Sequence, residues 1–293
     1  MKDLPDQIKI GTCSWKYDSW KGLVYSENVG KDYLSEYARQ YPVVEVDQWF
    51  WSLFGKTVVM PKPDVVVDYV ASVPDDFRFS IKVPNSITLT HQYQKGRKGP
   101  LEPNPYFLSN KLFDDFMALV SPMTEQIDSL IFQFEYLNKQ KLSGQMEFQE
   151  KMQRFFEACP SGYRYCIETR NKNYLNPKYF HFLKDLGLHH VFIQGYWMPS
   201  IFSLYKQHRE LIQDFCLIRL HGPDRKGIEQ KTGKKWDQIV DPKDMELQSL
   251  SEMLHDLMDR GLQVTVNVNN HFEGSAPQTI DKLIDLYFKG AAI

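Results

Sequence analysis

Eight short runs rich in β-branched and aromatic residues recur along this 293-residue chain, and segments with helical apolar spacing separate them. The runs expected to form strands are IKIGTC (8–13), VVEVD (43–47), FRFSIKV (77–83), SLIFQFE (129–135), YRYCIETR (163–170), HHVFIQ (189–194), CLIRLHG (216–222) and VTVNVNN (264–270). Helices are expected near residues 31–41, 64–72, 112–120, 148–156, 177–187, 201–213, 250–258 and 280–288.

This alternation predicts an α/β fold, a single (β/α)8 TIM barrel formed as one domain over residues 1–293. The long βα loops should follow strands 3 and 7, within residues 86–100 and 222–237. An open doubly wound sheet fits less well, because no G-x-G-x-x-G follows the first strand.

Composition limits the partners that such a barrel can attract. The formal net charge is −2, so the whole molecule exerts no general pull on nucleic acid or on an anionic membrane. No stretch approaches the roughly 20 apolar residues of a membrane span, and no obligate protein partner is implied. The four cysteines form no C-x-x-C pair, which is typical of small buried side chains in a reducing compartment, so we expect a cytoplasmic protein.

Polar residues lie at alternate positions near the carboxyl ends of most of the expected strands. Side chains two residues apart on a strand share a face, so these groups should line the barrel interior while their apolar neighbours face the helices. The inward set comprises Glu45, Asp47, Lys82, Gln133, Glu135, Glu168, Arg170, Arg219, His221, Asn267 and Asn269. Active sites of TIM barrels lie at this end of the strands, which favours a functional ring over a set of charges that pair only with one another.

All six tryptophans follow an expected strand and precede the next helix. Some must cover the mouth of the barrel, and others, Trp15 and Trp49 among them, are candidate platforms for a flat ligand. The two long loops are locally basic, a composition that suits a phosphorylated or polyanionic ligand as well as a solvated loop.

Seven ordered segments resemble the bacterial domain-of-unknown-function 72 family, also called YecE-like proteins. The matching segments are GTCSWKYDSWKG, VEVDQWFW, FRFSIKVPNSITLTH, FQFEYLN, ETRNKNYL, LIRLHG and NVNNHFEGSAP. The resemblance implies a TIM barrel and no settled reaction. This chain departs from the family pattern by having Asp47 in place of Asn, Glu135 in place of Pro, and Asn173-Tyr174 in place of Ser-Trp.

The polar ring favours a hydrolase or lyase that acts on a phosphorylated or nucleic-acid substrate. Catalytic roles are expected for Glu45, Glu168, His221 and Lys82, with the carboxylates as bases or metal ligands and the histidine as acid or base. Substrate binding is expected for a second set: Arg170, Arg219, Asn269, Asn270, Trp15, Trp49 and Gln133.

The cofactor is left open by the sequence. A divalent metal would suit Asp47 and Glu135, with loop residues His91 and His271 as further candidate ligands, and would make the protein a metal-dependent phosphoester hydrolase. No H-E-x-x-H motif supports this assignment.

Two other classes of function remain open on the sequence alone. A carbohydrate-active barrel would use two carboxylates about 5–9 Å apart, drawn from Glu45, Glu135 and Glu168. A protein that binds a small anion without chemistry would use Arg170 and Arg219 together with the asparagines.

Overall fold

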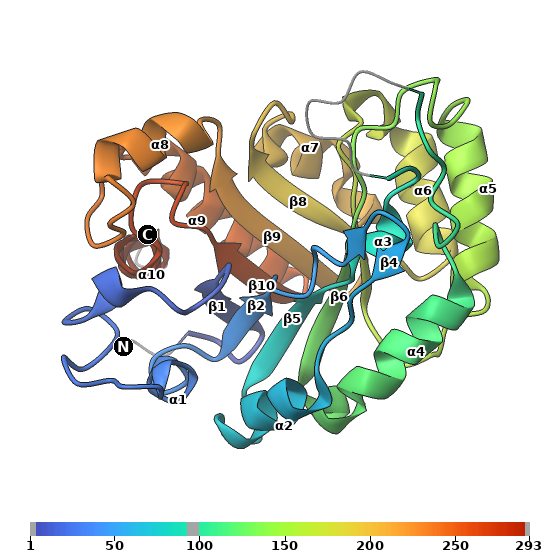
Figure 1. The fold of residues 1–293 in the computed structure, drawn as a ribbon. Helices are drawn as coiled ribbons and strands as arrows, with labels where there is room; N and C mark the ends of the chain where they lie inside the picture. Colours follow the sequence, from blue (N-terminus) through green and yellow to red (C-terminus); the bar gives the residue numbers. More distant parts are fainter. Residues whose placement is uncertain (1–3, 93–99, 291–293) are drawn as a thin grey trace.

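The computed structural model describes residues 4–92 and 100–290. Eight parallel strands close into a barrel in the order in which they occur along the chain, and the first pairs with the last (Figure 1). They are β1 (Ile8–Thr12), β2 (Val43–Val46), β5 (Arg78–Lys82), β6 (Ile127–Gln133), β7 (Tyr165–Glu168), β8 (His189–Gly195), β9 (Phe215–Gly222) and β10 (Gln263–Val268). The predicted (β/α)8 barrel is therefore confirmed.

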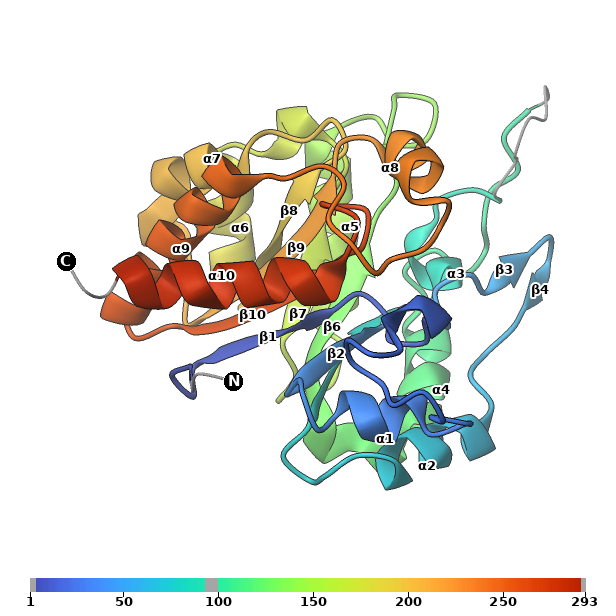
Figure 2. The same ribbon diagram turned by 90° about the vertical axis from the view of Figure 1, so that its left-hand side faces the viewer.

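Helices surround the barrel, with α9 and α10 packed side by side against its last strands (Figure 2). The α-helices are α1 (Tyr33–Tyr37), α2 (Pro63–Ala71), α3 (Asn85–Thr88), α4 (Asn110–Val120), α5 (Gln145–Phe156), α6 (Pro177–Asp185), α7 (Ile201–His208), α8 (Arg225–Thr232), α9 (Asp244–Asp259) and α10 (Ala276–Gly290). Four short 3-10 helices are η1 (Asp18–Trp20), η2 (Ser121–Gln126), η3 (Lys172–Tyr174) and η4 (Arg209–Leu211). None of the helices in the described ranges is long and apolar enough to cross a bilayer.

Three elements differ from the sequence-based expectation, and all lie in βα loops. A hairpin of β3 (Leu53–Phe54) and β4 (Thr57–Val58) follows β2 and projects away from the barrel in Figure 2. The loop after β5 contains α3, and the basic loop after β9 contains α8. The basic residues Lys95, Arg97 and Lys98 of the first long loop lie outside the described residues.

The barrel interior is layered along its axis. At the amino ends of the strands, the buried Asp128 carboxylate accepts a hydrogen bond from Thr265 (2.8 Å) and pairs with Arg164 (3.5 Å). An apolar layer follows, formed by Ile131, Cys166, Val191, Phe215 and Leu217, and it is separate from the main core between strands and helices. The residues two positions further along β7 and β9 are Glu168 and Arg219, so the apolar layer forms the floor beneath the charged ring.

Candidate functional site at the barrel mouth

A fully buried guanidinium joins two carboxylates across the barrel interior. Arg219 on β9 donates from Nε to Glu45 Oε2 (2.7 Å) and from Nη2 to Glu45 Oε1 (2.6 Å), and its Nη1 contacts Glu168 on β7. Glu168 also pairs with Arg170, at the start of the next loop. Strands β2, β9 and β7 are therefore tied together by one chain of ion pairs, which we call the ion chain (Glu45, Arg219, Glu168 and Arg170).

The ion chain holds the Glu168 carboxylate in the ionised form. Burial opposes ionisation of Glu168, but the nearby charges of Arg170 and Arg219 outweigh it and lower the pKa of this carboxyl to about 2. A general acid must carry a proton near neutral pH, so Glu168 is unsuited to that role. Glu45 accepts both bonds of a bidentate pair and also lies 3.5 Å from Asn267 Nδ2. Three of the five N–H groups of Arg219 point at these two carboxylates, so its charge is committed to the ion chain rather than to a substrate phosphate.

Lys82, at the end of β5, is buried beside the ion chain but does not join it. Across the described ranges its ammonium forms no ion pair or hydrogen bond, and Nζ lies over the Phe50 ring, 3.8 Å from the centroid. Burial lowers the pKa of Lys82, and the positive charge of Arg219 lowers it further, against the opposing effect of Glu45, Glu168 and Asp47.

Asp47 follows β2 and is half-buried at the same end of the barrel. Burial raises the pKa of Asp47 to about 6, and the negative charge of Glu45 contributes to the rise. The pKa of the neighbouring Tyr17 is raised by burial and by the charge of Asp47. Among the predicted site carboxylates, Asp47 is thus the one suited to exchange a proton near neutral pH.

His221 is a buried, neutral histidine at the end of β9. Its Nδ1 lies 3.1 Å from the Tyr196 hydroxyl, and its Nε2 lies 3.6 Å from Cys13 Sγ. Burial and the charge of Arg219 lower the pKa of His221 well below its usual value, so the ring is uncharged at neutral pH. Burial likewise raises the pKa of the Cys13 thiol, which remains protonated.

Two glycines allow the chain to present Tyr196 to His221. Gly195 has a φ of 135°, and a Cβ at this position would lie 2.4 Å from the carbonyl oxygen of Gly222. Because Gly195 lacks a side chain, the end of β8 approaches Gly222 of β9 closely and the Tyr196 amide donates to Gly222 O (2.9 Å). A Cβ on Gly222 would lie 2.5 Å from the carbonyl oxygen of His271, so this glycine allows β9 to lie against the loop after β10. The Tyr196 ring is then held beneath the Arg170 guanidinium, whose Cζ lies 4.4 Å from the ring centroid.

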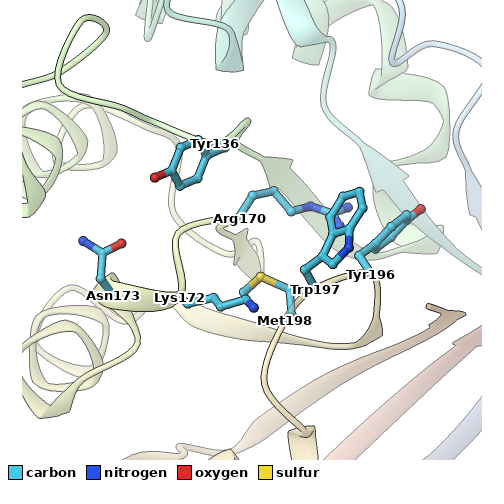
Figure 3. A pocket seen from close by; sticks show the side chains of 7 residues that line it. All are labelled: Tyr136, Arg170, Lys172, Asn173, Tyr196, Trp197 and Met198. Carbon is cyan, nitrogen blue, oxygen red and sulfur yellow. The ribbon is translucent and has the colours of Figure 1, made fainter. Parts of the chain in front are cut away.

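An open pocket of about 620 Å³ lies beside this arrangement, on the loops after β6, β7 and β8 (Figure 3). Its lining residues are Tyr136, Arg170, Lys172, Asn173, Tyr196, Trp197 and Met198. Trp197 is 80% exposed and Tyr136 is 61% exposed, so aromatic faces are available to a ligand. In Figure 3, Arg170 extends toward Tyr196 and so connects the pocket with the ion chain.

The predicted aromatic platforms lie elsewhere in the mouth. Trp15 and Trp49 are both buried and pack against Tyr69 of α2, with ring centroids 5.0 and 5.7 Å away. Their faces are therefore in contact with protein, which leaves Trp197 as the tryptophan that lines the pocket.

The amides predicted to bind substrate are in part engaged with the backbone. Asn270 Oδ1 accepts a hydrogen bond from the Ala276 amide (2.9 Å) at the start of α10, and Asn269 Oδ1 accepts one from the His271 amide (3.0 Å). Gln133 is half-buried at the end of β6, opposite Glu168 in the strand register.

The two metal candidates occupy different surroundings. Glu135 pairs with Lys141 and accepts a hydrogen bond from Thr90 (3.0 Å), whereas Asp47 lies near Lys82 and Glu45. Within residues 4–92 and 100–290, no cluster of three or more His, Cys, Asp or Glu side chains has the geometry to hold a metal ion. His91 contacts Thr90, and His271 contacts Glu229 (3.1 Å).

Sequence reasoning misses most of the pocket. Tyr136, Lys172, Tyr196 and Met198 do not stand out, since a single residue in a loop carries no periodic signal. The usable signal is position: Tyr136 follows β6 and the run Tyr196-Trp197-Met198 follows β8, where ligand-binding loops of a barrel begin.

A family model described as "Protein of unknown function DUF72" matches residues 9–291. The chain is 26% identical over 167 residues to the UPF0759 protein YecE of Escherichia coli, from strain K12 and from O157:H7. This match covers 57% of the chain and 50% of each relative, so the chain spans about half the length of the curated relatives it matches.

Two solved structures share the fold at low sequence identity. A DUF72 family protein from Thermotoga maritima aligns with a TM-score of 0.64 and 19% identity, over 98% of this chain and 99% of that chain. One from Enterococcus faecalis aligns with a TM-score of 0.67 and 19% identity, over 96% and 95%. At this identity the likeness concerns the barrel architecture alone.

Proposed function

The chain belongs to the DUF72 family of proteins of unknown function, and from the geometry of its barrel mouth we propose that it is an enzyme, a hydrolase or lyase, acting on a small phosphorylated substrate with a flat group, such as a nucleotide. One observation carries this proposal. The pocket combines two cations, Arg170 and Lys172, with the exposed aromatic face of Trp197. A phosphate would pair with the cations while the flat group stacks on the indole.

We assign the chemistry to Asp47 and Lys82, two titratable groups outside the ion chain. Asp47, with a pKa of about 6, can take or give a proton near neutral pH. Lys82 supplies an amine or an ammonium group beside it. Glu45, Glu168 and Arg219 act as positioning residues, because their fixed charges set the electrostatic environment of both groups.

Binding of a phosphate-bearing compound tests the pocket. We expect a thermal-shift panel of nucleotides and sugar phosphates to contain a compound that stabilises the protein. Its affinity should fall about tenfold in Trp197→Ala and in Lys172→Gln, since base stacking and charge pairing are each worth about 1–3 kcal/mol. Matched controls are the exposed Trp51→Ala and Lys111→Gln, which lie outside the pocket and should bind as the wild type does.

Turnover separates catalysis from plain binding. Each stabilising compound should be consumed by the wild type and not by Asp47→Asn. Stabilisation without product would favour the alternative, a protein that binds a small anion without chemistry. The observation that supports this alternative is that Glu45 and Glu168 are both paired with Arg219. Titration with Mg²⁺, Mn²⁺ and Zn²⁺ tests whether the protein is a metal-dependent hydrolase. If none of these ions binds with a dissociation constant below about 1 mM, the metal-dependent mechanism is wrong.

A location in the cytoplasm belongs to the same proposal. Cys13, Cys159, Cys166 and Cys216 are all free thiols, which fits a reducing compartment.

A further inference from the structure

Lys82 differs from Arg219 and Arg164, the cations at the two ends of the barrel interior, in having no carboxylate partner among the described residues. Arg219 has two carboxylate partners, and Arg164 at the opposite end pairs with Asp128. In the described part of the chain Lys82 has no such partner, although it is only 8% exposed and ends a strand that points into the mouth. Once the Lys82 amine loses its proton, its nitrogen lone pair is available for reaction.

The contacts around Lys82 disfavour a structural role. A buried lysine that stabilises a fold is paired and hydrogen-bonded, because an unpaired buried charge costs several kcal/mol. Here the neighbour of Nζ is the face of Phe50, 3.8 Å away, which excludes water and offers no hydrogen-bond acceptor oxygen. Nucleophilic lysines are activated in this way, by desolvation and by a nearby second cation.

We propose that Lys82 is a nucleophile that forms an imine with an aldehyde or ketone substrate at the barrel mouth, with Asp47 as the acid beside it. This inference deepens the proposed function and rests on it for the phosphate, which would occupy the pocket at Arg170 and Lys172. The substrate class is therefore a phosphorylated carbonyl compound, in which a flat group on Trp197 adds to binding and is not needed for the covalent step.

The covalent step balances without an oxidant or reductant. The neutral Nζ attacks the carbonyl carbon, a C–N bond forms, and the carbonyl π pair moves to oxygen. Asp47 in its acid form gives a proton to that oxygen, and its carboxylate then takes one proton from the nitrogen, which leaves a neutral carbinolamine and restores the acid form of Asp47. Asp47 in its acid form then protonates the hydroxyl, water leaves, and the nitrogen lone pair forms the C=N bond of the iminium. Water reverses the sequence and restores the lysine and the carbonyl.

The charges that face Lys82 come from several strands, and they explain why its amine is available. Burial and the charge of Arg219 on β9 lower the pKa of Lys82. The charges of Glu45 on β2, Glu168 on β7 and Asp47 just after β2 oppose this shift. His221 faces the same space and is uncharged at neutral pH. Each unit by which the pKa falls raises the neutral fraction about tenfold, so Lys82 should react well before any exposed lysine.

Reductive trapping tests the inference on the intact wild-type chain. The protein is incubated near neutral pH with glycolaldehyde phosphate or dihydroxyacetone phosphate and sodium cyanoborohydride, which delivers hydride to the iminium carbon. Peptide mass spectrometry should find the reduced adduct on Lys82 at about tenfold or more above the exposed Lys111. Lys82→Arg should abolish that adduct and leave the thermal melting temperature within a few degrees of wild type. Labelling spread over exposed lysines, or an unlabelled Lys82, overturns the inference.

Parallel reactions with glycolaldehyde and dihydroxyacetone separate this inference from the proposed function. Labelling of Lys82 by both kinds of compound at equal rates supports the imine and contradicts the phosphate site. Phosphate-dependent stabilisation that is lost in Lys172→Gln, with Lys82 unlabelled, supports the phosphate site and contradicts the imine. Because the peptide map is read on the wild type, the outcome does not depend on whether Lys82→Arg folds.

Discussion

Replacing Arg219 with methionine is expected to lower the free energy of unfolding by about 3–5 kcal/mol. The substitution removes the guanidinium that is buried between Glu45 and Glu168 and leaves two carboxylates in the barrel interior without their shared partner. An uncompensated buried charge is among the most destabilising changes available to a folded chain. Urea denaturation at neutral pH, followed by circular dichroism, measures the effect.

Two controls identify the cause of the loss. Arg225→Met removes an exposed i,i+4 pair with Glu229 and should cost no more than about 0.5 kcal/mol. The triple variant Glu45→Gln, Glu168→Gln, Arg219→Met removes the stranded charges along with the cation and should regain most of the stability. A loss below about 1 kcal/mol in Arg219→Met would contradict the stabilising role assigned to the ion chain.

Replacing Asp47 with asparagine is expected to stabilise the protein by up to about 3 kcal/mol at pH 8. The pKa of this carboxyl is about 6 in the folded protein against an ordinary 3.8, so the folded state binds the proton more tightly than the unfolded state does. The ionised form therefore destabilises the fold above about pH 6, and this penalty declines as the pH falls from 6 to 3.8. Asparagine carries no charge and avoids the penalty.

Chemical denaturation of both proteins between pH 3.5 and 8 checks the sign and the window. The advantage of Asp47→Asn should be full above pH 6 and absent below 3.8. Asp68→Asn on the exposed face of α2 is the matched control and should show no such dependence. An advantage that persists at pH 3.5 would assign the effect to something other than ionisation. Together with loss of turnover in Asp47→Asn, the expected result would mean that this chain accepts lower stability in order to keep a proton-exchanging group at the barrel mouth.

The barrel could be predicted from the sequence because its signals are local. Each strand places apolar side chains toward the helices on alternate residues, and helices such as α4, α5, α9 and α10 repeat their apolar positions at helical spacing. The elements that were missed lack such periodicity. The β3–β4 hairpin has two residues in each strand. Helix α8 buries Ile228 and Thr232 and is capped by Asp224, whose carboxylate accepts a hydrogen bond from the Gly227 amide (2.9 Å).

The site was predictable only as a set of residues. Alternation along the strands placed Glu45, Lys82, Glu168 and Arg219 in the interior, and the structure buries all four. Which charge pairs with which depends on contacts across the barrel, and Arg219 reaches Glu45 over 174 positions of sequence. Asp47 and Lys82 can be identified as charged groups outside the ion chain only once those pairs are known. Residue type alone favoured Glu45 and Glu168 as acid–base groups. Both carboxylates pair with Arg219, which supports our proposal that Asp47 has that role instead.

The ion chain also restricts how this protein can diverge. Glu45, Arg219 and Glu168 come from β2, β9 and β7 and are all buried. If one of them were replaced alone, a charge on another would remain buried without its partner. A substitution at one position is tolerated only when compensating changes occur on distant strands. Homologous sequences should therefore keep all three residues or replace all three. The loops at the barrel mouth are not constrained in this way. Substitutions there can change ligand preference while the ion chain stays unchanged.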